Sequence, residues 1–124
     1  LRLKLENNVT IGDFRPQIAE LLSGASILVV PSQANESFGL TIIEAMAFGV
    51  PVVTTDVGGM PEVLEGSNAG YVCSKDDPLE FSAAIINILS DPPLAFELGR
   101  NGRLTFERRF KANTMAINYA KLLE

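Results

Sequence analysis

The sequence contains no histidine, no tryptophan and a single cysteine, Cys73. One cysteine cannot form an internal disulfide, and without histidine the chain has none of the Cys/His combinations that are typical of zinc sites. A D-x-D motif is missing as well. The sequence therefore predicts no metal held by the protein and no cofactor.

Long hydrophobic runs are also scarce. The most apolar stretches stop at Pro31 and Asn87, well short of the length needed to span a membrane. The N-terminus carries charges among its leucines, which does not fit a signal peptide. We therefore predict a cytoplasmic protein, with peripheral attachment to a membrane left open for a full-length form.

Positive charge is unevenly distributed. The net charge is −5, and no lysine or arginine occurs between Pro16 and Ser74. Both facts argue against a nucleic-acid partner. The cations gather near the end of the chain, at Arg100, Arg103, Arg108, Arg109 and Lys111. Such a cluster, mixed with acids, is typical of a solvated helix face.

Short apolar runs alternate with segments of helical periodicity. Strands are predicted at Val9–Gly12, Ala25–Val30, Pro51–Thr55 and Gly70–Cys73, and the second and third of these as strands buried on both faces. Helices are predicted at Pro16–Leu22, Gly39–Phe48, Pro61–Leu64, Pro78–Leu89 with Asp77 as cap, Pro92–Arg108 and Asn113–Leu123. This alternation predicts an α/β fold, a Rossmann-like parallel sheet with flanking helices.

The loop that follows Val30, and the helix after it, carry the strongest functional signal. Ligands of such sheets bind at the carboxyl ends of the strands, where this loop is expected. At Phe38-Gly39-Leu40 the loop becomes a helix, so free backbone N–H groups and the positive end of the helix dipole favour a phosphate. Gly39, which has no β-carbon, also lets a ligand approach the backbone.

Two acids flank this helix start. Glu44 is the single charged residue of an apolar helix, and burying its carboxylate would be costly without a partner. We expect it to accept hydrogen bonds from the hydroxyls of a ligand, with Glu36 at the other end of the same molecule. A simpler interpretation places Glu44 on a narrow exposed stripe and Glu36 in a solvated loop. The two acids with an aromatic-glycine helix start between them favour ligand binding.

The segment Glu36-Ser-Phe-Gly-Leu-Thr-Ile-Ile-Glu44 resembles the E-x7-E motif of the retaining GT-B glycosyltransferases of family 4 (group 1). Further motifs of that family follow the same order, from about residue 9 to the C-terminus. Val9–Gly12 matches the short strand ending in glycine, and Val30–Ser32 matches V-P-S. Gly49–Val53 matches G-x-P-V-V, Gly58–Glu62 matches G-G-x-P-E, and Gly70–Cys73 matches G-x-x-V.

This resemblance implies that residues 1–124 are part of a C-terminal nucleotide-sugar-binding domain, the C-terminal half of a GT-B fold. The donor, a UDP- or GDP-sugar, would lie in a cleft that faces an N-terminal acceptor-binding domain. The whole enzyme would transfer the glycosyl group with retention and without a metal. Two carboxylates near a sugar also occur in glycosidases, but a phosphate site at a helix end has no use in hydrolysing a plain glycoside.

The resemblance also assigns roles to individual residues. Glu36 would be catalytic, positioning the donor sugar and stabilising a cationic transition state. The donor-binding stretch continues through Ser37 to the backbone of Phe38, Gly39 and Leu40, which would contact sugar hydroxyls and pyrophosphate. Glu44 would bind the ribose hydroxyls. Gly12 and Asp13 would lie near the nucleobase, whereas Glu62 is interpreted as a structural cap.

One feature of the family is missing. Its members hold the pyrophosphate with an arginine and a lysine from the first part of the domain, and none of Arg2, Lys4 and Arg15 stands in that Gly-Arg context. We therefore expect a chain that is incomplete at its N-terminus and inactive alone. Exposed strand edges would then favour self-association.

The alternative function is that of a non-catalytic module that binds a nucleotide-sugar or scaffolds a partner. An unrelated nucleotide binder is disfavoured, because neither G-x-G-x-x-G nor a P-loop is present.

Overall fold

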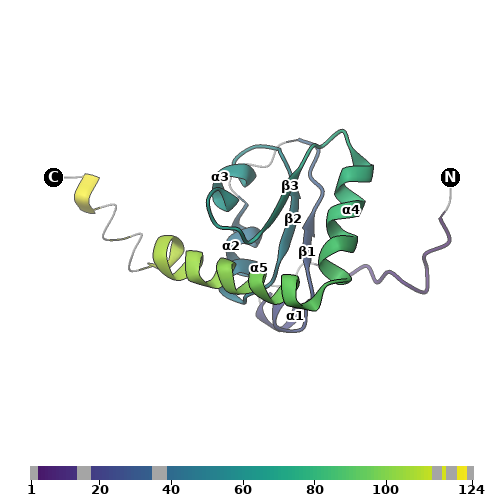
Figure 1. Ribbon diagram of the computed structural model, residues 1–124, viewed down its shortest axis with the longest axis horizontal. Helices are drawn as coiled ribbons and strands as arrows, with labels where there is room; N and C mark the ends of the chain where they lie inside the picture. Colours follow the sequence, from purple (N-terminus) through teal and green to yellow (C-terminus); the bar gives the residue numbers. More distant parts are fainter. Residues whose placement is uncertain (1–2, 14–17, 35–38, 113–115, 117–119, 123–124) are drawn as a thin grey trace.

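The computed structural model describes residues 3–13, 18–34, 39–112, 116 and 120–122. Its centre is a sheet of three strands, β1 (Leu28–Val30), β2 (Val52–Thr55) and β3 (Gly70–Cys73), which lie side by side in chain order. Both pairs are parallel; Val52 stands opposite Leu28 on one side and opposite Gly70 on the other. Helices flank the sheet (Figure 1). The predicted α/β fold with a parallel sheet is confirmed.

The helices are α1 (Ala19–Ser23), α2 (Leu40–Ala47), α3 (Met60–Leu64), α4 (Pro78–Leu89) and α5 (Pro92–Thr105), and α5 continues into a π-helical turn, η1 (Phe106–Phe110). The two long helices begin in the same way, with an aspartate followed by proline. The carboxylate of Asp77 accepts the Glu80 N–H at 3.0 Å, and that of Asp91 accepts the Leu94 N–H at 3.1 Å. These bonds satisfy N–H groups that have no partner within the helix.

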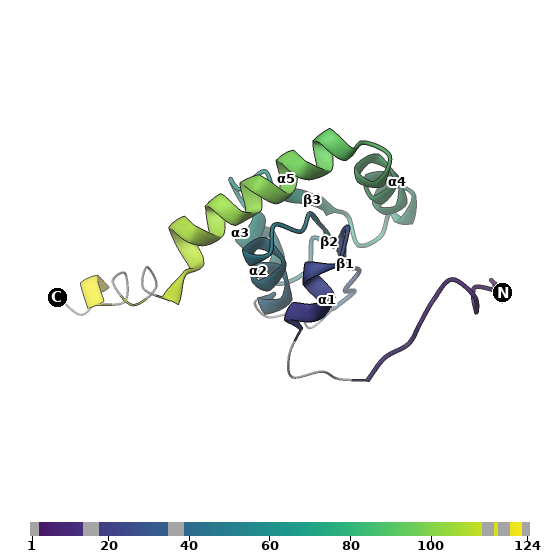
Figure 2. The same ribbon diagram turned by 90° about the horizontal axis from the view of Figure 1, so that it is seen from below.

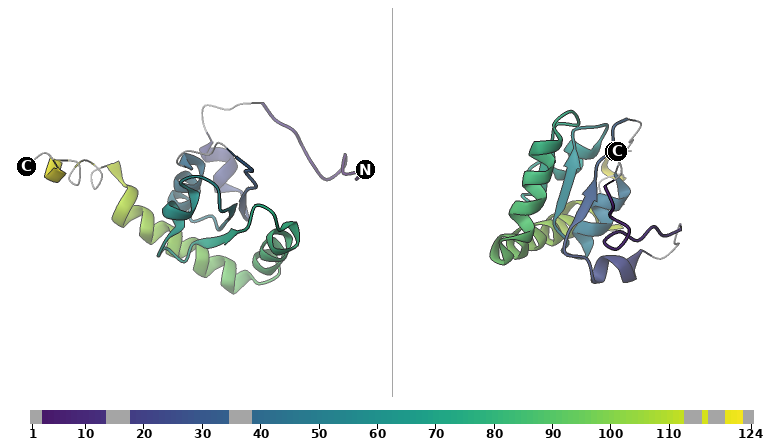
Figure 3. Two further views of the ribbon diagram at one scale, coloured as in Figure 1. Left: turned by 90° about the horizontal axis from the view of Figure 1, so that it is seen from above. Right: turned by 90° about the vertical axis from the view of Figure 1, so that its right-hand side faces the viewer.

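Strand β2 separates two layers of core. Val52 packs with α1, α2 and α3, whereas its neighbour Val53 packs with α4 and α5. Successive side chains of a strand point to opposite faces, so both faces of β2 are covered. All four residues of β2 are buried, as predicted. Figure 3 shows α4 on one side of the sheet and α2 on the other.

Helix α5 runs across the amino ends of the strands. Its Gly99 lies against Gly49, which precedes β2, and its Gly102 lies against Met46 and Ala69. The Asn101 side chain donates to the Asn68 carbonyl at 3.0 Å. Figures 1 and 2 show α5 running past the sheet, with one end beside α4. The opposite edge, formed by the carboxyl ends of the strands, is the one where α2 begins.

Several sequence predictions need correction. Val9–Gly12 forms no strand; it is exposed throughout, and Ile11 is 94% exposed. A four-residue run becomes a strand only where a neighbouring strand pairs with it, and no strand of the described residues pairs with this segment. β1 is shorter than Ala25–Val30 and is not buried on both faces, because it is an edge strand with Val29 at 37% exposure.

The remaining differences concern helix ends. α1 begins at Ala19 and ends at Ser23, later than the predicted Pro16–Leu22, of which residues 16–17 lie outside the described residues. α5 ends at Thr105 rather than Arg108, because the chain switches to a π-helical turn. The helix predicted at Asn113–Leu123 lies largely outside the described residues. In the part of the chain that is described, no helix is long and apolar enough to span a membrane.

Candidate functional site at the start of helix α2

Gly39 forms the turn at which α2 begins. Its backbone is left-handed, with φ 74° and ψ 46°, a conformation that side chains other than glycine rarely adopt. Its carbonyl accepts the Ile42 N–H at 3.0 Å, which closes the first turn. Gly39 is buried, and a β-carbon there would lie 3.2 Å from Ile42 Cδ1 and 3.4 Å from Met60 Cγ. Glycine is therefore required by the backbone conformation at this point.

Helix α2 has one buried face and one exposed face. Ile42, Ile43, Ala45 and Met46 are buried, and Leu40, Thr41, Glu44 and Phe48 are exposed. The exposed residues recur every three or four positions, so they form one stripe. Leu40 is 65% exposed and Phe48 46% exposed, so the stripe carries apolar surface on both sides of Glu44.

Glu44 lies in the middle of this exposed stripe. The prediction that its carboxylate is surrounded by apolar side chains is therefore wrong. The apolar neighbours in the sequence point into the core, while the helical period turns Glu44 outward. A solvated carboxylate needs no compensating partner, and the buried-charge argument for a ligand does not apply. In the described residues Glu44 has no ion pair, and its carboxylate lies one turn from the start of α2.

The other predicted site residues do not all meet there. Glu36, Ser37 and Phe38 lie outside the described residues. Gly12 and Asp13 are exposed and belong to a segment without helix or strand, which runs away from the sheet and helices (Figures 1 and 2). The structure thus brings Gly39, Leu40 and Glu44 together and leaves Gly12 and Asp13 apart from them.

The loops at the carboxyl edge of the sheet are tied to one another. Lys75 lies just beyond β3, and its backbone N–H donates a hydrogen bond to Asp56 Oδ1 at 3.0 Å. Its backbone carbonyl accepts a hydrogen bond from the Gln33 side-chain amide at 3.1 Å. Its ammonium lies 3.3 Å from Asp76 Oδ1 and is partly exposed. This cation at the carboxyl edge of the sheet was not among the predicted site residues. Its position two residues after a predicted strand was the available signal.

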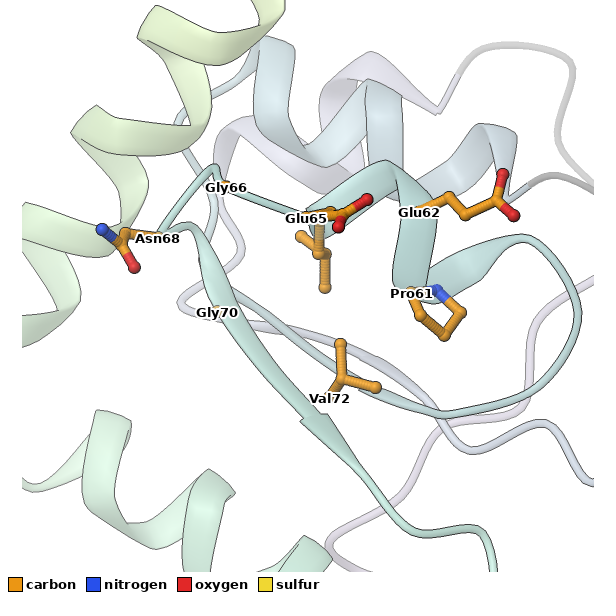
Figure 4. A pocket seen from close by; sticks show the side chains of 8 residues that line it. Pro61, Glu62, Glu65, Gly66, Asn68, Gly70 and Val72 are labelled. Carbon is orange, nitrogen blue, oxygen red and sulfur yellow. The ribbon is translucent and has the colours of Figure 1, made fainter.

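A hollow of about 460 Å³ lies elsewhere, between α3 and the outer edge of β3. Figure 4 shows Val72 rising from β3 toward Pro61, with Glu65 and Asn68 at the rim. Of the predicted site residues that the structure describes, none lines it. The carboxylates of Glu62 and Glu65, both beside the hollow, would repel a diphosphate. We therefore place the candidate site at the start of α2.

Two arginines of the C-terminal cluster turn back onto the helices around the site. Arg103 donates to the carbonyl of Ala47, the last residue of α2, and pairs with Glu107. Arg109 donates to the carbonyl of Glu65, just after α3, at 3.0 Å, and to that of Glu62 at 3.4 Å. The interpretation of the cluster as a solvated helix face is therefore incomplete, because these two side chains satisfy carbonyl groups at helix ends.

Comparison with known proteins settles the family. A family model described as "Glycosyl transferases group 1" matches residues 1–105 of the chain. The chain belongs to this family. The predicted resemblance to group 1 glycosyltransferases is thereby confirmed.

Individual glycosyltransferases extend the comparison. N-acetyl-alpha-D-glucosaminyl L-malate synthase of Bacillus anthracis is 33% identical over 117 residues, covering 94% of the chain and 30% of the synthase. The crystal structure of Anabaena HepE in complex with UDP superposes with a TM-score of 0.88 at 29% identity, over 96% of the chain and 33% of HepE. Sucrose-phosphate synthase of Thermosynechococcus elongatus gives a TM-score of 0.76 at 37% identity, over 86% of the chain and 26% of the synthase.

These glycosyltransferases carry the fold expected for this chain, a Rossmann-like part of the GT-B architecture. The chain spans about 30% of the length of the curated relative from B. anthracis and a similar share of HepE.

Proposed function

We propose that this chain is the donor-binding part, residues 1–124, of a glycosyltransferase that transfers a glycosyl group from a nucleotide-sugar with retention. The bond between the anomeric carbon and the β-phosphate oxygen would break, and an acceptor oxygen would bond to that carbon on the same face. The acceptor proton would leave with the nucleoside diphosphate. An N-terminal acceptor-binding domain would complete the enzyme.

The observation that carries the proposal is the exposed stripe of α2 at the carboxyl edge of the sheet. Leu40 and Thr41, the first two residues of α2, have N–H groups without an intrahelical acceptor. These groups and the helix dipole favour a diphosphate. Glu44, one turn further along the same stripe, is free to accept hydrogen bonds from ribose hydroxyls. HepE, which matches 96% of this chain, was crystallised with UDP and with UDP-glucose.

The roles of the other residues follow from the E-x7-E motif. Glu36 would be the catalytic residue beside the donor sugar, with Ser37 and the backbone of Phe38 and Gly39 in the same donor-binding stretch. Gly12 and Asp13 would approach the nucleobase only if the N-terminal segment docked onto the sheet. Such docking would require strands next to β1, the edge strand whose outer side is free in the described residues.

Calorimetry with UDP and GDP on the glycosyltransferase that carries this chain tests the proposal. Glu44→Ala should weaken binding of the preferred nucleotide about tenfold, since hydrogen bonds to a charged group are lost. Glu36→Ala should leave nucleotide affinity within about twofold and abolish most transfer, measured as release of the nucleotide from its sugar. Glu97→Ala, which removes an exposed carboxylate on α5, is the matched control. Unchanged affinity in Glu44→Ala would contradict the assigned role.

The same experiment separates the second candidate, a non-catalytic module. The absence of lysine and arginine between Pro16 and Ser74 favours it, because helix-end amides alone replace two cations poorly at a departing diphosphate. Binding of a nucleotide-sugar without any transfer by the full-length protein would support the module.

Self-association of the isolated chain is a further part of the proposal. β1 and β3 are both edge strands, and Val29 and Val72 are 37% and 39% exposed on them. Unpaired backbone groups on such edges invite pairing with another chain. Light scattering on the isolated chain should show dimers or larger species at high concentration. A single monomeric species would rule this out.

A further inference from the structure

The carboxyl end of α2 is held by one side chain from another helix. Arg103 of α5 donates to the Ala47 carbonyl, one of the last carbonyls of α2, which have no partner within the helix. The guanidinium is itself held on two more sides, by the Glu107 carboxylate and by the Phe106 ring, 5.6 Å from its centroid. A side chain fixed at three points offers a well-defined anchor for the helix end.

The packing around this bond brings α5 into close contact with the end of α2. Gly99 of α5 approaches Gly49 so closely that a β-carbon would lie 2.1 Å from the Gly49 oxygen. One turn further along α5, Gly102 lies against Met46 of α2, where a β-carbon would come within 3.5 Å of the Met46 Cα. α5 thus meets the end of α2 backbone to backbone, with Arg103 directly after these contacts.

An α-helix transmits displacement from one end to the other. α2 has eight residues, which makes it about 12 Å long at 1.5 Å per residue. Ala47 is its last residue and Leu40 its first. A helix of this length does not bend appreciably, so a shift at Ala47 moves Leu40 and Glu44 as well.

We propose that Arg103 is a positioning residue for the donor site. It fixes the end of α2 at the amino edge of the sheet, and so sets where Leu40 and Glu44 meet the nucleotide at the carboxyl edge. This inference rests on the proposed function of α2 as the donor-binding helix. Arg103 would itself touch neither the nucleotide nor the sugar, because it lies at the end of α2 opposite Leu40.

The chain contains a matched control for the stability of the fold. Arg109 plays the same chemical part at another helix: it donates to the carbonyls of Glu65 and Glu62 at the end of α3 and lies 4.8 Å from the centroid of the Phe110 ring. Removing either guanidinium leaves carbonyls at a helix end without a donor. Only Arg103, however, acts on the helix that bears Glu44.

The test compares Arg103→Met, Arg103→Lys, Arg109→Met and Arg100→Met in the glycosyltransferase that carries this chain. Arg100 lies three residues before Arg103 on α5 and has no hydrogen bond or ion pair in the described residues, so it controls for loss of charge. Each variant is measured for the melting temperature and for the Kd of whichever of UDP and GDP binds the wild type more tightly.

Arg103→Met should weaken nucleotide binding about tenfold or more, since a small misplacement of binding groups is costly. Arg103→Lys, which keeps a donor and a positive charge, should recover most of that loss. Arg109→Met should lower the melting temperature about as much as Arg103→Met does, because both variants leave helix-end carbonyls without a donor. Its Kd for the nucleotide should stay within about twofold of the wild-type value. Arg100→Met should change neither quantity.

Two results would overturn the inference: an unchanged Kd in Arg103→Met, or a Kd that worsens equally in Arg103→Met and Arg109→Met, which would indicate a purely structural role. The proposed function fails in a different way. If the wild type binds neither nucleotide, or Glu44→Ala binds as tightly as the wild type, the donor-binding role of α2 and the positioning role of Arg103 both fall.

Discussion

The α-carbon of Gly99 faces the carbonyl oxygen of Gly49 with no room for a side chain between them. A β-carbon at Gly99 would lie 2.1 Å from that oxygen. Alanine is the better helix former by about 1 kcal/mol, so propensity alone would favour Gly99→Ala. A clash with backbone outweighs that gain, and we expect Gly99→Ala to destabilise the fold by about 2 kcal/mol or more. Chemical denaturation of the variant measures this loss.

Gly24→Ala provides the comparison. Gly24 is the C-cap residue that follows α1, its backbone is right-handed, and a β-carbon there would meet nothing within 4 Å. This variant should be neutral or slightly stabilising, because alanine restricts the unfolded chain more than glycine does. Equal stability of the two variants would contradict the close packing of α5 against the turn at Gly49.

The N-cap of α5 gives a second prediction. Asp91 Oδ1 accepts the Leu94 N–H at 3.1 Å, so Asp91→Ala should cost about 1 kcal/mol of unfolding free energy. Asp91→Asn keeps an oxygen at the same place and should cost much less. Denaturation curves of the two variants distinguish a capping role from a charge effect. A charge effect would lower the unfolding free energy of Asp91→Ala and Asp91→Asn equally.

The ion pairs of Glu107 give a prediction about pH. Its pKa lies below the ordinary value of 4.5, because Lys111 donates a hydrogen bond to the carboxylate and Arg103 adds positive charge. A lowered folded-state pKa means that the charged form favours folding. This contribution is fully present above the pKa of Glu107 in the unfolded chain, and it is lost as the pH falls through the lower pKa of the folded state.

The difference in melting temperature between wild type and Glu107→Gln should therefore shrink as pH falls from about 6 to about 3. Both cations are solvent-exposed, so the difference should also shrink in high salt. A constant difference across this pH range would show that Glu107 contributes through packing rather than charge.

Cys73 offers a chemical probe of the core. Burial raises the pKa of its thiol above 9.0, and the charges of Glu80 and Asp77 add to the effect. The residue is 3% exposed. Because the thiolate is the reactive form, the folded protein should react with a thiol reagent at least about a hundredfold more slowly than the unfolded chain. Fast reaction without denaturant would show that β3 opens readily.

The order and type of the elements could be predicted from the sequence, because each carries its own local signal. The pair Asp77-Pro78 predicts the start of α4. The end predicted for this helix, Leu89, is also correct. The same Asp-Pro pair precedes α5. Val9–Gly12 carried the same kind of signal as β2 and yet forms no strand, because pairing depends on a neighbouring strand that a local pattern does not reveal.

The candidate site was predicted in part. Composition alone made Glu44 look buried, because Ile42, Ile43, Ala45 and Met46 surround it in the sequence. Their positions around the helix, which turn the apolar side chains inward and Glu44 outward, carry the missing information. Arg103 could not have been linked to α2 from sequence, since its partner Ala47 is 56 positions away.

That long separation between Arg103 and Ala47 bears on how the protein is made. During synthesis, each strand and the helix after it can dock on the unit before it as soon as both have left the ribosome. α5 (Pro92–Thr105) can dock only after the segments it contacts, at Met46, Gly49 and Ala69, have been made, and it then lies across the amino ends of β2 and β3. A nascent chain that stops before α5 would lack the helix that lies against Met46 and Ala69, and apolar surface exposed at that stage would favour aggregation.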